Sequence, residues 1–276
     1  MQPEKGDPRI RVGVNEVRDG FRAVGARPND TLLYHGSLSS MGMVAGGPTT
    51  VINGALAAVS PNGTVAMPTL WYHDPKENNP ADFNVHTSPS FIGLLSECFR
   101  TDPRSIRSND FSHSVSAIGP RAAELTADHE KSAFLRTPWS NRAFGDGSPW
   151  SRLYAWDALY CFIGVALNVC TMKHYIEARC VAECLAQTAP DRREQLASRL
   201  CRIGVPTGIW PWIDIVKLGE LLAQDGLVTT GKIGSATIRG IRTRPLVDRT
   251  SALLRQAPHT WFGPEYLEWR ADCLQS

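Results

Sequence analysis

Residues 31–68 hold two short apolar runs on either side of one helical pattern. The runs, "TLLYHGSL" and "GTVAMPTL", have the length and the turn boundaries of buried strands. Between them, Pro48 begins a segment in which Val51, Leu56 and Val59 form an apolar stripe at helical spacing. A strand, a helix and a strand joined by tight connections predict two parallel neighbours in an α/β layer. This unit restricts the fold class more than any other feature of the chain.

The rest of the chain continues the alternation of helical and strand-like segments. An apolar stripe predicts a helix over residues 10–25, and another helix is expected in "SPSFIGLLSECFR", with Ser88 or Ser90 as its cap. "SVSAIG" and "ALYCFIGVAL" have the pattern of strands, and a helix is expected to follow Thr171. The C-terminal part predicts a helix in "IDIVKLGELLAQDG", a strand in "GKIGSATIRGI" and a final helix near "LVDRTSALLRQ". We expect a single α/β domain over residues 1–276.

Charge and composition are those of an ordinary soluble protein. The 29 basic and 27 acidic residues leave a net charge of +2 without a long block of one sign, so nucleic acid is not an expected partner. The N-terminus lacks the apolar core of a signal peptide, and the apolar run after Asp157, about ten residues, is too short to cross a bilayer. The seven cysteines are scattered without a zinc-finger spacing, as buried thiols are in a reducing cytoplasm. We expect a cytoplasmic protein with no membrane partner and no metal.

Several motifs that indicate a particular chemistry are missing. The sequence has no P-loop, no G-x-G-x-x-G after the first strand, no G-x-S-x-G and no H-E-x-x-H. Polar residues instead flank the expected strands in "HGSLSSMG", "MPTL", "RSNDFSHSVSAIG" and "TMKHYIE". Because ligands bind at the carboxyl ends of strands in open α/β sheets, we expect these four segments to converge on one cleft.

His174 in "TMKHYIE" has three interpretations from spacing alone: a catalytic base, a metal ligand, or a packed histidine at a helix start. Glu177 lies three residues further on, within reach of the same helical face. Thr171 is a candidate helix cap. A metal-dependent hydrolase that uses His35, His113 and His174 stays open at this point, although no ligand spacing supports it.

Several motifs resemble those of the aminoglycoside 3-N-acetyltransferase family. "HGSLSSMGMVAGGPTTVINGALAAVSPNGTVAMPT" resembles its opening, and "SPSFIGLLSECFR", "RS…S…A.G", "GSPWSRLY" and T-x-x-H-x-x-E follow in the family's order. The similarity covers residues 8–180 and continues weakly through 181–276, the portion that would complete the fold. It implies an α/β/α sandwich with a largely parallel central sheet, distinct from the GNAT acetyltransferases. It also implies acetyl-CoA as co-substrate and an amine as acceptor, and it allows a homodimer.

The resemblance assigns roles to individual residues. His174 matches the family's catalytic histidine, and an imidazole with an ordinary pKa of about 6.5 is largely neutral and able to take the proton of an attacking amine. Either Glu177 or Asp214 would orient its ring, and Thr171 would cap the helix or bond the thioester carbonyl. The coenzyme-binding candidates are His35, Ser37, Leu38, Ser39, Gly42, Thr69, Ser114 and Thr171. The acceptor-binding candidates are Tyr72, Glu97 and Asp110.

The sequence also departs from the family's pattern. Asp110 and Phe111 in "RSNDF" stand where the family usually has histidine and proline. The expected acceptor loop, residues 71–90, contains only three acids, namely Asp74, Glu77 and Asp82. A polycationic aminoglycoside favours a strongly acidic cleft, whereas this chain is slightly basic. Besides an aminoglycoside or related amino sugar, a small biosynthetic amine therefore remains as acceptor, and so does a coenzyme-A-binding protein without transferase activity.

Overall fold

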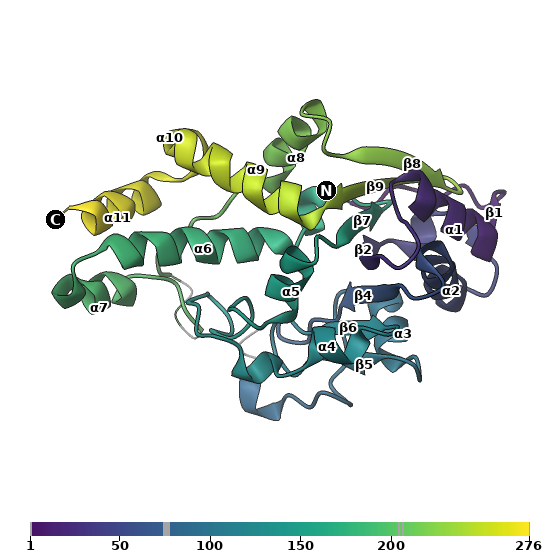
Figure 1. Ribbon diagram of the computed structural model, residues 1–276, viewed down its shortest axis with the longest axis horizontal. Helices are drawn as coiled ribbons and strands as arrows, with labels where there is room; N and C mark the ends of the chain where they lie inside the picture. The colour runs from purple at the N-terminus through teal and green to yellow at the C-terminus, as the bar shows by residue number, and fades with distance from the viewer. Residues whose placement is uncertain (1, 74–77, 204, 206, 276) are drawn as a thin grey trace.

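The computed structural model describes residues 2–73, 78–203, 205 and 207–275. Within these residues, the centre of the molecule is a seven-stranded sheet in the order β5-β6-β4-β2-β7-β9-β8 (Figure 1). Its strands are β2 (Thr31–Gly36), β4 (Thr64–Pro68), β5 (Ile106–Arg107), β6 (Val115–Ile118), β7 (Leu159–Ile163), β8 (Thr229–Ile233) and β9 (Ala236–Arg242). A separate parallel pair consists of β1 (Arg11–Val12) and β3 (Met43–Val44).

The three central strands of the large sheet are parallel. β2 lies between β4 and β7 and is parallel to both, which confirms the parallel pair predicted for residues 31–68. On the flanks, β6 is antiparallel to β4 and β9 is antiparallel to β7, and each edge strand is antiparallel to its neighbour. The α/β class is confirmed, and the antiparallel flanks make the sheet mixed.

The segment "GKIGSATIRGI", predicted as one strand, is a hairpin instead. β8 and β9 pair antiparallel through a tight turn in which Gly234 has a φ of 57°. A left-handed φ favours glycine, and a Cβ at this position would also collide with the carbonyl oxygen of Met41. The turn residue therefore divides a continuous strand pattern into two strands.

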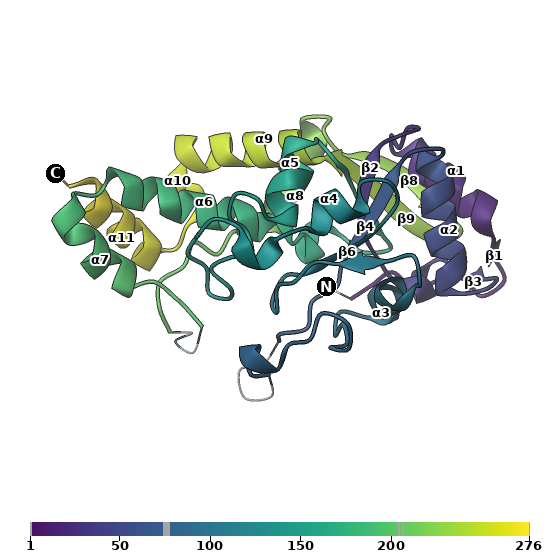
Figure 2. The same cartoon turned by 60° about the horizontal axis from the view of Figure 1, so that its bottom comes forward.

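Helices cover both faces of the sheet, as the predicted α/β/α sandwich requires (Figure 2). One face carries α1 (Val14–Ala23), α2 (Pro48–Val59) and α3 (Leu94–Thr101). The other carries α4 (Ala122–Thr126), α5 (Pro149–Ala155), α6 (Met172–Gln187) and α9 (Thr243–Gln256). Successive side chains of a strand point to opposite faces. Leu32 and Tyr34 therefore belong to the apolar core under α1, α2 and α3, and Leu33 belongs to the core under α4, α5, α6 and α9.

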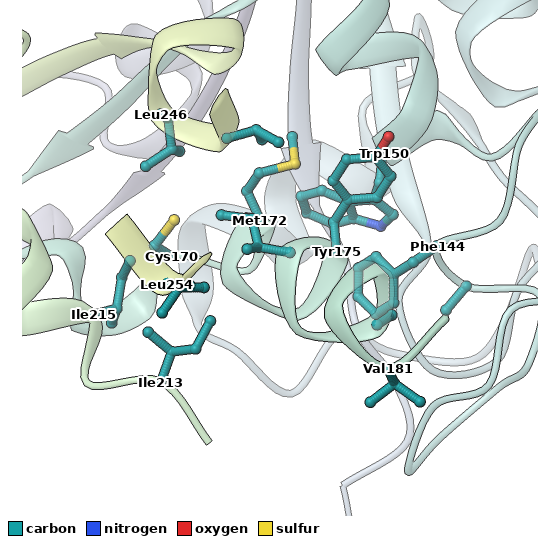
Figure 3. Packing of buried hydrophobic residues seen from close by; sticks show 14 of the residues in the cluster. Phe144, Trp150, Cys170, Met172, Tyr175, Val181, Ile213, Ile215, Leu246 and Leu254 are labelled. Atoms are coloured by element: carbon teal, nitrogen blue, oxygen red, sulfur yellow. The ribbon is translucent and has the colours of Figure 1, made fainter. Parts of the chain in front are cut away.

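The helices α6 and α9 run side by side past the sheet, and further helices pack on them (Figure 1). These are α7 (Pro190–Ser198), α8 (Ile215–Gln224), α10 (Pro258–Trp261) and α11 (Pro264–Leu274). The predicted final helix is thus followed by two more, each of which begins with a proline in its first turn. At the start of α6, Met172 and Tyr175 lie among buried side chains that include Phe144 and Trp150 (Figure 3).

Two predicted helix starts need correction. α3 begins after Gly93, which has a φ of 127°, and not at Ser88 or Ser90. The Ser90 hydroxyl instead lies 2.8 Å from that of Ser96. The helix expected over residues 10–25 begins at Val14, after the short strand β1.

The remaining short elements are 3-10 turns, namely η1 (Leu38–Ser40), η2 (Pro80–Asp82), η3 (His129–Lys131) and η4 (Leu167–Val169). In the described ranges, none of the helices combines the length and the apolarity needed to cross a bilayer.

Candidate active site

Two adjoining cavities open where β2 and β7 end. The first, about 620 Å³, is lined by the loop after β2, and the second, about 530 Å³, by the start of α6. Because His35, Ile92, Gly93 and Val169 line both, the two cavities form one strand-end groove. The groove lies at this edge because β2 and β7 are parallel neighbours, so the segments that follow them leave the sheet together.

The strand-end groove brings together a large part of the predicted site. The predicted residues that line it are His35, Ser37, Leu38, Ser39, Gly42, Thr171 and His174. The hydroxyls of Ser37 and Ser39 lie 3.2 Å apart. Gly42 has a φ of 103°, and a Cβ there would lie 2.7 Å from the carbonyl oxygens of Asp7 and Ile10. The N-terminal segment, rather than a ligand, therefore requires a glycine at this position.

His174 and Glu177 form a hydrogen-bonded pair on the first turns of α6. The Nδ1 atom of His174 lies 2.7 Å from Oε2 of Glu177, and the Glu177 side chain is fully buried. The same carboxylate accepts hydrogen bonds from Nε1 of Trp210 at 3.1 Å and from the backbone N–H of Ile213 at 3.0 Å. Because an ionised carboxylate only accepts hydrogen bonds, Nδ1 carries the proton of the neutral imidazole. The lone pair of Nε2 is then left to accept a proton.

Asp214, the second candidate partner of His174, has a different position. It is the N-cap residue of α8, and its carboxylate accepts the backbone N–H groups of Val216 and Lys217, each at 3.1 Å. The first amides of a helix lack partners within the helix, and an aspartate at this position satisfies them. Of the two carboxylates, the one that bonds His174 in the structure is that of Glu177.

Aromatic rings surround His174, and sequence reasoning missed most of them. The ring centroid of Trp139 lies 4.3 Å from that of His174, and those of His113, Phe144 and Trp212 lie 5.7, 6.2 and 6.5 Å away. The sequence "WPW" at 210–212 was an available signal, because paired tryptophans outside an apolar run need a structural or binding reason. No local pattern, however, connects this segment or Trp139 with residue 174.

His35 and Thr171 form a buried contact at the floor of the groove. Nε2 of His35 lies 3.3 Å from the Thr171 hydroxyl, and the imidazole stacks on Phe162 at an interplanar angle of 14°. Thr171 occupies the N-cap position of α6, but its side chain makes no capping hydrogen bond, so the predicted cap is wrong. Its backbone N–H donates to the Tyr160 hydroxyl at 3.1 Å. Among the described residues, no group of three or more His, Cys, Asp or Glu side chains is arranged to hold a metal ion.

Thr69 and Ser114, two predicted coenzyme contacts, are buried at the junction of β4 and β6. The Ser114 hydroxyl donates to the carbonyl oxygen of Thr69 at 2.8 Å and accepts from Nε of Arg107 at 3.1 Å. The Thr69 hydroxyl lies 3.0 Å from that of Ser116. These bonds join neighbouring segments of the sheet, and neither residue is among those that line the strand-end groove.

The predicted acceptor contacts also make internal contacts. Oδ1 of Asp110, which is buried, accepts from the Ser112 hydroxyl at 2.8 Å and from the backbone N–H of His113 at 2.7 Å, so it shapes the turn that places His113. Glu97 pairs with the Arg100 guanidinium. Tyr72 packs edge-on against Phe111 at 5.4 Å. Of the loop acids, Asp82 ends the turn η2, whereas Asp74 and Glu77 lie outside the described residues.

Three buried histidines predict that the protein loses stability in mild acid. Burial lowers the pKa of His35 and of His113 to about 3, and it lowers the pKa of His129 in the same direction. Below about pH 6.5 the unfolded chain takes up protons at these positions while the folded chain does not. The free energy of unfolding should therefore fall as the pH drops from about 6.5 towards 3, by at most about 1.4 kcal/mol per pH unit for each histidine.

Urea denaturation at a series of pH values between neutrality and mild acid measures this dependence. The variant His113→Gln removes one of the three groups, so its free energy of unfolding should depend less steeply on pH than that of the wild type. A slope that is the same in both proteins would contradict the assignment for His113.

A histidine paired with a buried carboxylate, beside an elongated groove at the strand ends of an α/β sheet, is an arrangement typical of enzymes that move a proton during group transfer or hydrolysis. The sequence profile of the aminoglycoside 3-N-acetyltransferase family matches residues 33–255. The chain belongs to this family. It is therefore an acyltransferase that transfers an acetyl group to an amino group.

Individual relatives agree with this membership. Aminoglycoside N(3)-acetyltransferase VII of Streptomyces paromomycinus is 28% identical over 262 residues, which cover 82% of this chain and 85% of the relative. Aminoglycoside N(3)-acetyltransferase III of a Salmonella species is 32% identical over 59% of each chain. The fold is similar to that of aminoglycoside acetyltransferase AAC(3)-IVa, with a TM-score of 0.69, 22% identity and coverage of 97% of this chain and 95% of that one. AAC-IIIb, solved with CoASH, gives a TM-score of 0.68 at 19% identity, covering 92% and 98%.

Proposed function

We propose that this protein acetylates an amine of an aminoglycoside or a related amino sugar, with Nε2 of His174 as the base. The observation that carries the proposal is the 2.7 Å hydrogen bond between Nδ1 of His174 and the buried carboxylate of Glu177, at a histidine that lines the strand-end groove. Family membership supports the reaction type, and this hydrogen bond supports the assignment of the base.

In the proposed reaction the amine nitrogen bonds to the acetyl carbon, and the carbon–sulfur bond of the thioester breaks. The proton that the amine loses goes to Nε2 of His174, and the departing sulfur of coenzyme A takes up a proton. Glu177 holds the ring with Nδ1 protonated and stabilises the imidazolium that forms when Nε2 accepts its proton. This sequence of steps needs no covalent bond between the acetyl group and the protein.

The cysteine that lines the groove together with His174 is poorly suited to carry the acetyl group, which favours direct transfer. Cys170 lines the cavity beside His174, and burial raises the pKa of its thiol to about 12. A thiol becomes a good nucleophile only as the thiolate, which is scarce at neutral pH when the pKa is this high. We therefore assign Cys170 a packing role and not that of an acyl carrier.

The loop after β2 offers a place for the coenzyme. Ser37, Leu38 and Ser39 line the larger cavity together with the apolar side chains of Leu94 and Val165. A groove with backbone polar groups, two hydroxyls and apolar walls suits the pantetheine arm, which alternates amides and methylene groups. We assign the donor to this end of the groove and the acceptor to the end at His174.

An acceptor with fewer positive charges than an aminoglycoside is a second candidate. Among the described residues that line the cavity at His174, Lys173 carries a fixed positive charge and none is a carboxylate. A cationic side chain in the cavity disfavours a polycation by like-charge repulsion.

The function is tested by mixing the purified protein with acetyl-CoA and an amine panel of sisomicin, apramycin, glucosamine and a simple alkylamine. We expect release of free thiol that depends on the acceptor, and a product heavier than the acceptor by one acetyl group in mass spectrometry. If calorimetry shows that CoA binds but no acceptor in the panel is acetylated, the transferase proposal fails for these acceptors, and a coenzyme-binding role replaces it.

A further inference from the structure

We propose that Trp212 and Trp139 form the acceptor platform, on which the ring of an amino sugar stacks with its amine directed at His174. This inference rests on the proposed function and narrows the acceptor to an amino sugar with an open apolar ring face and few positive charges. The platform is defined by these two indoles, which come from segments far apart in the sequence.

The arrangement of the rings supports the platform. Trp139 lies 4.3 Å from His174 between ring centroids at an interplanar angle of 62°, and Trp212 lies 6.1 Å from Trp139 at 75°. Trp212 is 53% exposed, whereas the side chain of His174 is only 16% exposed. An indole that is half in water beside an almost covered base offers apolar area that a flat ligand would remove from water.

Trp212 is held in place by the residues that hold the base. Its neighbours on both sides anchor the segment, since Nε1 of Trp210 and the backbone N–H of Ile213 donate to the carboxylate of Glu177. Asp214 then ends the segment by capping α8. Because the backbone on both sides of Trp212 is already held, binding at this exposed indole has little further backbone to order, which favours a role in recognition.

The two indoles and the strand-end groove both border His174. The described residues that line the cavity at His174 include His35, Thr171 and Lys173, and they do not include either indole. An acceptor whose sugar ring lies on the indoles would therefore place only its amine in the end of the groove at His174, while the acetyl donor occupies the end at Ser37.

The charges around the platform favour a sparsely charged acceptor. Lys173 lies in the cavity, and the nearby carboxylate of Glu177 is buried and already accepts three hydrogen bonds. Recognition through an indole face needs no carboxylate, because sugar C–H groups and a single ammonium group both interact favourably with the aromatic ring.

The test compares Trp212→Ala and Trp212→Phe with the wild type, with glucosamine as the acceptor. We expect Trp212→Ala to raise the KM for glucosamine by about tenfold, the equivalent of about 1.4 kcal/mol, with little change in kcat, and Trp212→Phe to restore most of the affinity. Phe134→Ala is the matched control, because Phe134 is 56% exposed and lines different cavities, so its KM should stay at the wild-type value.

A KM for glucosamine that is unchanged in Trp212→Ala overturns the platform and leaves the transferase function standing. Acetylation of sisomicin without acetylation of glucosamine overturns the assigned acceptor class. If the wild type releases no thiol with any amine, the platform is tested instead by the quenching of tryptophan fluorescence by glucosamine in the presence of CoA. Saturable quenching that is lost in Trp212→Ala then supports the platform while the transferase function fails, and its absence in the wild type rejects both.

Discussion

Replacing His174 by alanine should lower kcat by about 10²–10⁴-fold, the range expected when a positioned general base is removed. The imidazole is the group in the strand-end groove whose Nδ1 is held by a buried carboxylate at 2.7 Å, which leaves Nε2 to take the proton of the amine. Without it, a proton must leave the adduct for water, which is poorly placed and a weak base. Steady-state assays with a saturating acceptor measure the loss.

Two controls separate chemistry from folding in this variant. His174 is only partly buried, so His174→Ala should melt close to the wild-type temperature and bind CoA with similar affinity by calorimetry. His259→Ala removes an exposed histidine on α10 and should keep the wild-type kcat. Added imidazole should restore part of the lost rate in His174→Ala, and it should not raise the rate of the wild type or of His259→Ala. A kcat within a few-fold of the wild type in folded His174→Ala would sink the proposed mechanism.

Changing Glu177 to glutamine should lower kcat by a similar factor, about 10²–10⁴-fold, and also cost about 1–3 kcal/mol of stability. The buried carboxylate accepts three hydrogen bonds, from His174, Trp210 and Ile213. A glutamine has one oxygen and one NH₂ group, so the NH₂ group must face either the N–H of Ile213 or the N–H groups of both His174 and Trp210. If the NH₂ group faces His174, the ring takes the other tautomer and Nε2 carries a proton that blocks its use as a base. Kinetics and urea denaturation measure the two effects.

Asp214 provides the matched control for the Glu177 variant. Asp214→Ala removes the cap of α8 and should cost about 1 kcal/mol of stability while kcat stays at the wild-type value. Asp214→Asn should keep most of the stability, because asparagine also caps helices well. A collapse of kcat in Asp214→Ala together with normal activity in Glu177→Gln would make Asp214 the residue that orients the base.

Several features that depend on near neighbours in the chain were predictable from the sequence. The strand–helix–strand unit of residues 31–68 follows from apolar spacing and tight connections, and the structure has it. The pair of His174 and Glu177 follows from helical geometry, because residues three apart share a face. The loop from Ser37 to Gly42 lines the groove because it directly follows a central strand.

Only the tertiary structure decided between contacts that join distant segments. Trp210 lies 33 residues from Glu177, and no local pattern shows that its indole binds this carboxylate while Asp214 caps a helix. Strand direction on the flanks was equally hidden, since an apolar run does not show which neighbour it will pair with. The burial of Ser114 against Thr69 likewise depends on the pairing of β4 with β6.

The sequence by itself thus determined the α/β class and placed a histidine and its carboxylate on one helical turn, because periodicity and spacing act over a few residues. The tertiary structure decided what surrounds that histidine. Trp139 and Trp212 reach it from segments 35 and 38 residues away, through contacts that exist only once the chain has packed. Apolar burial and hydrogen-bond satisfaction act through space, and they select those partners only in the folded chain.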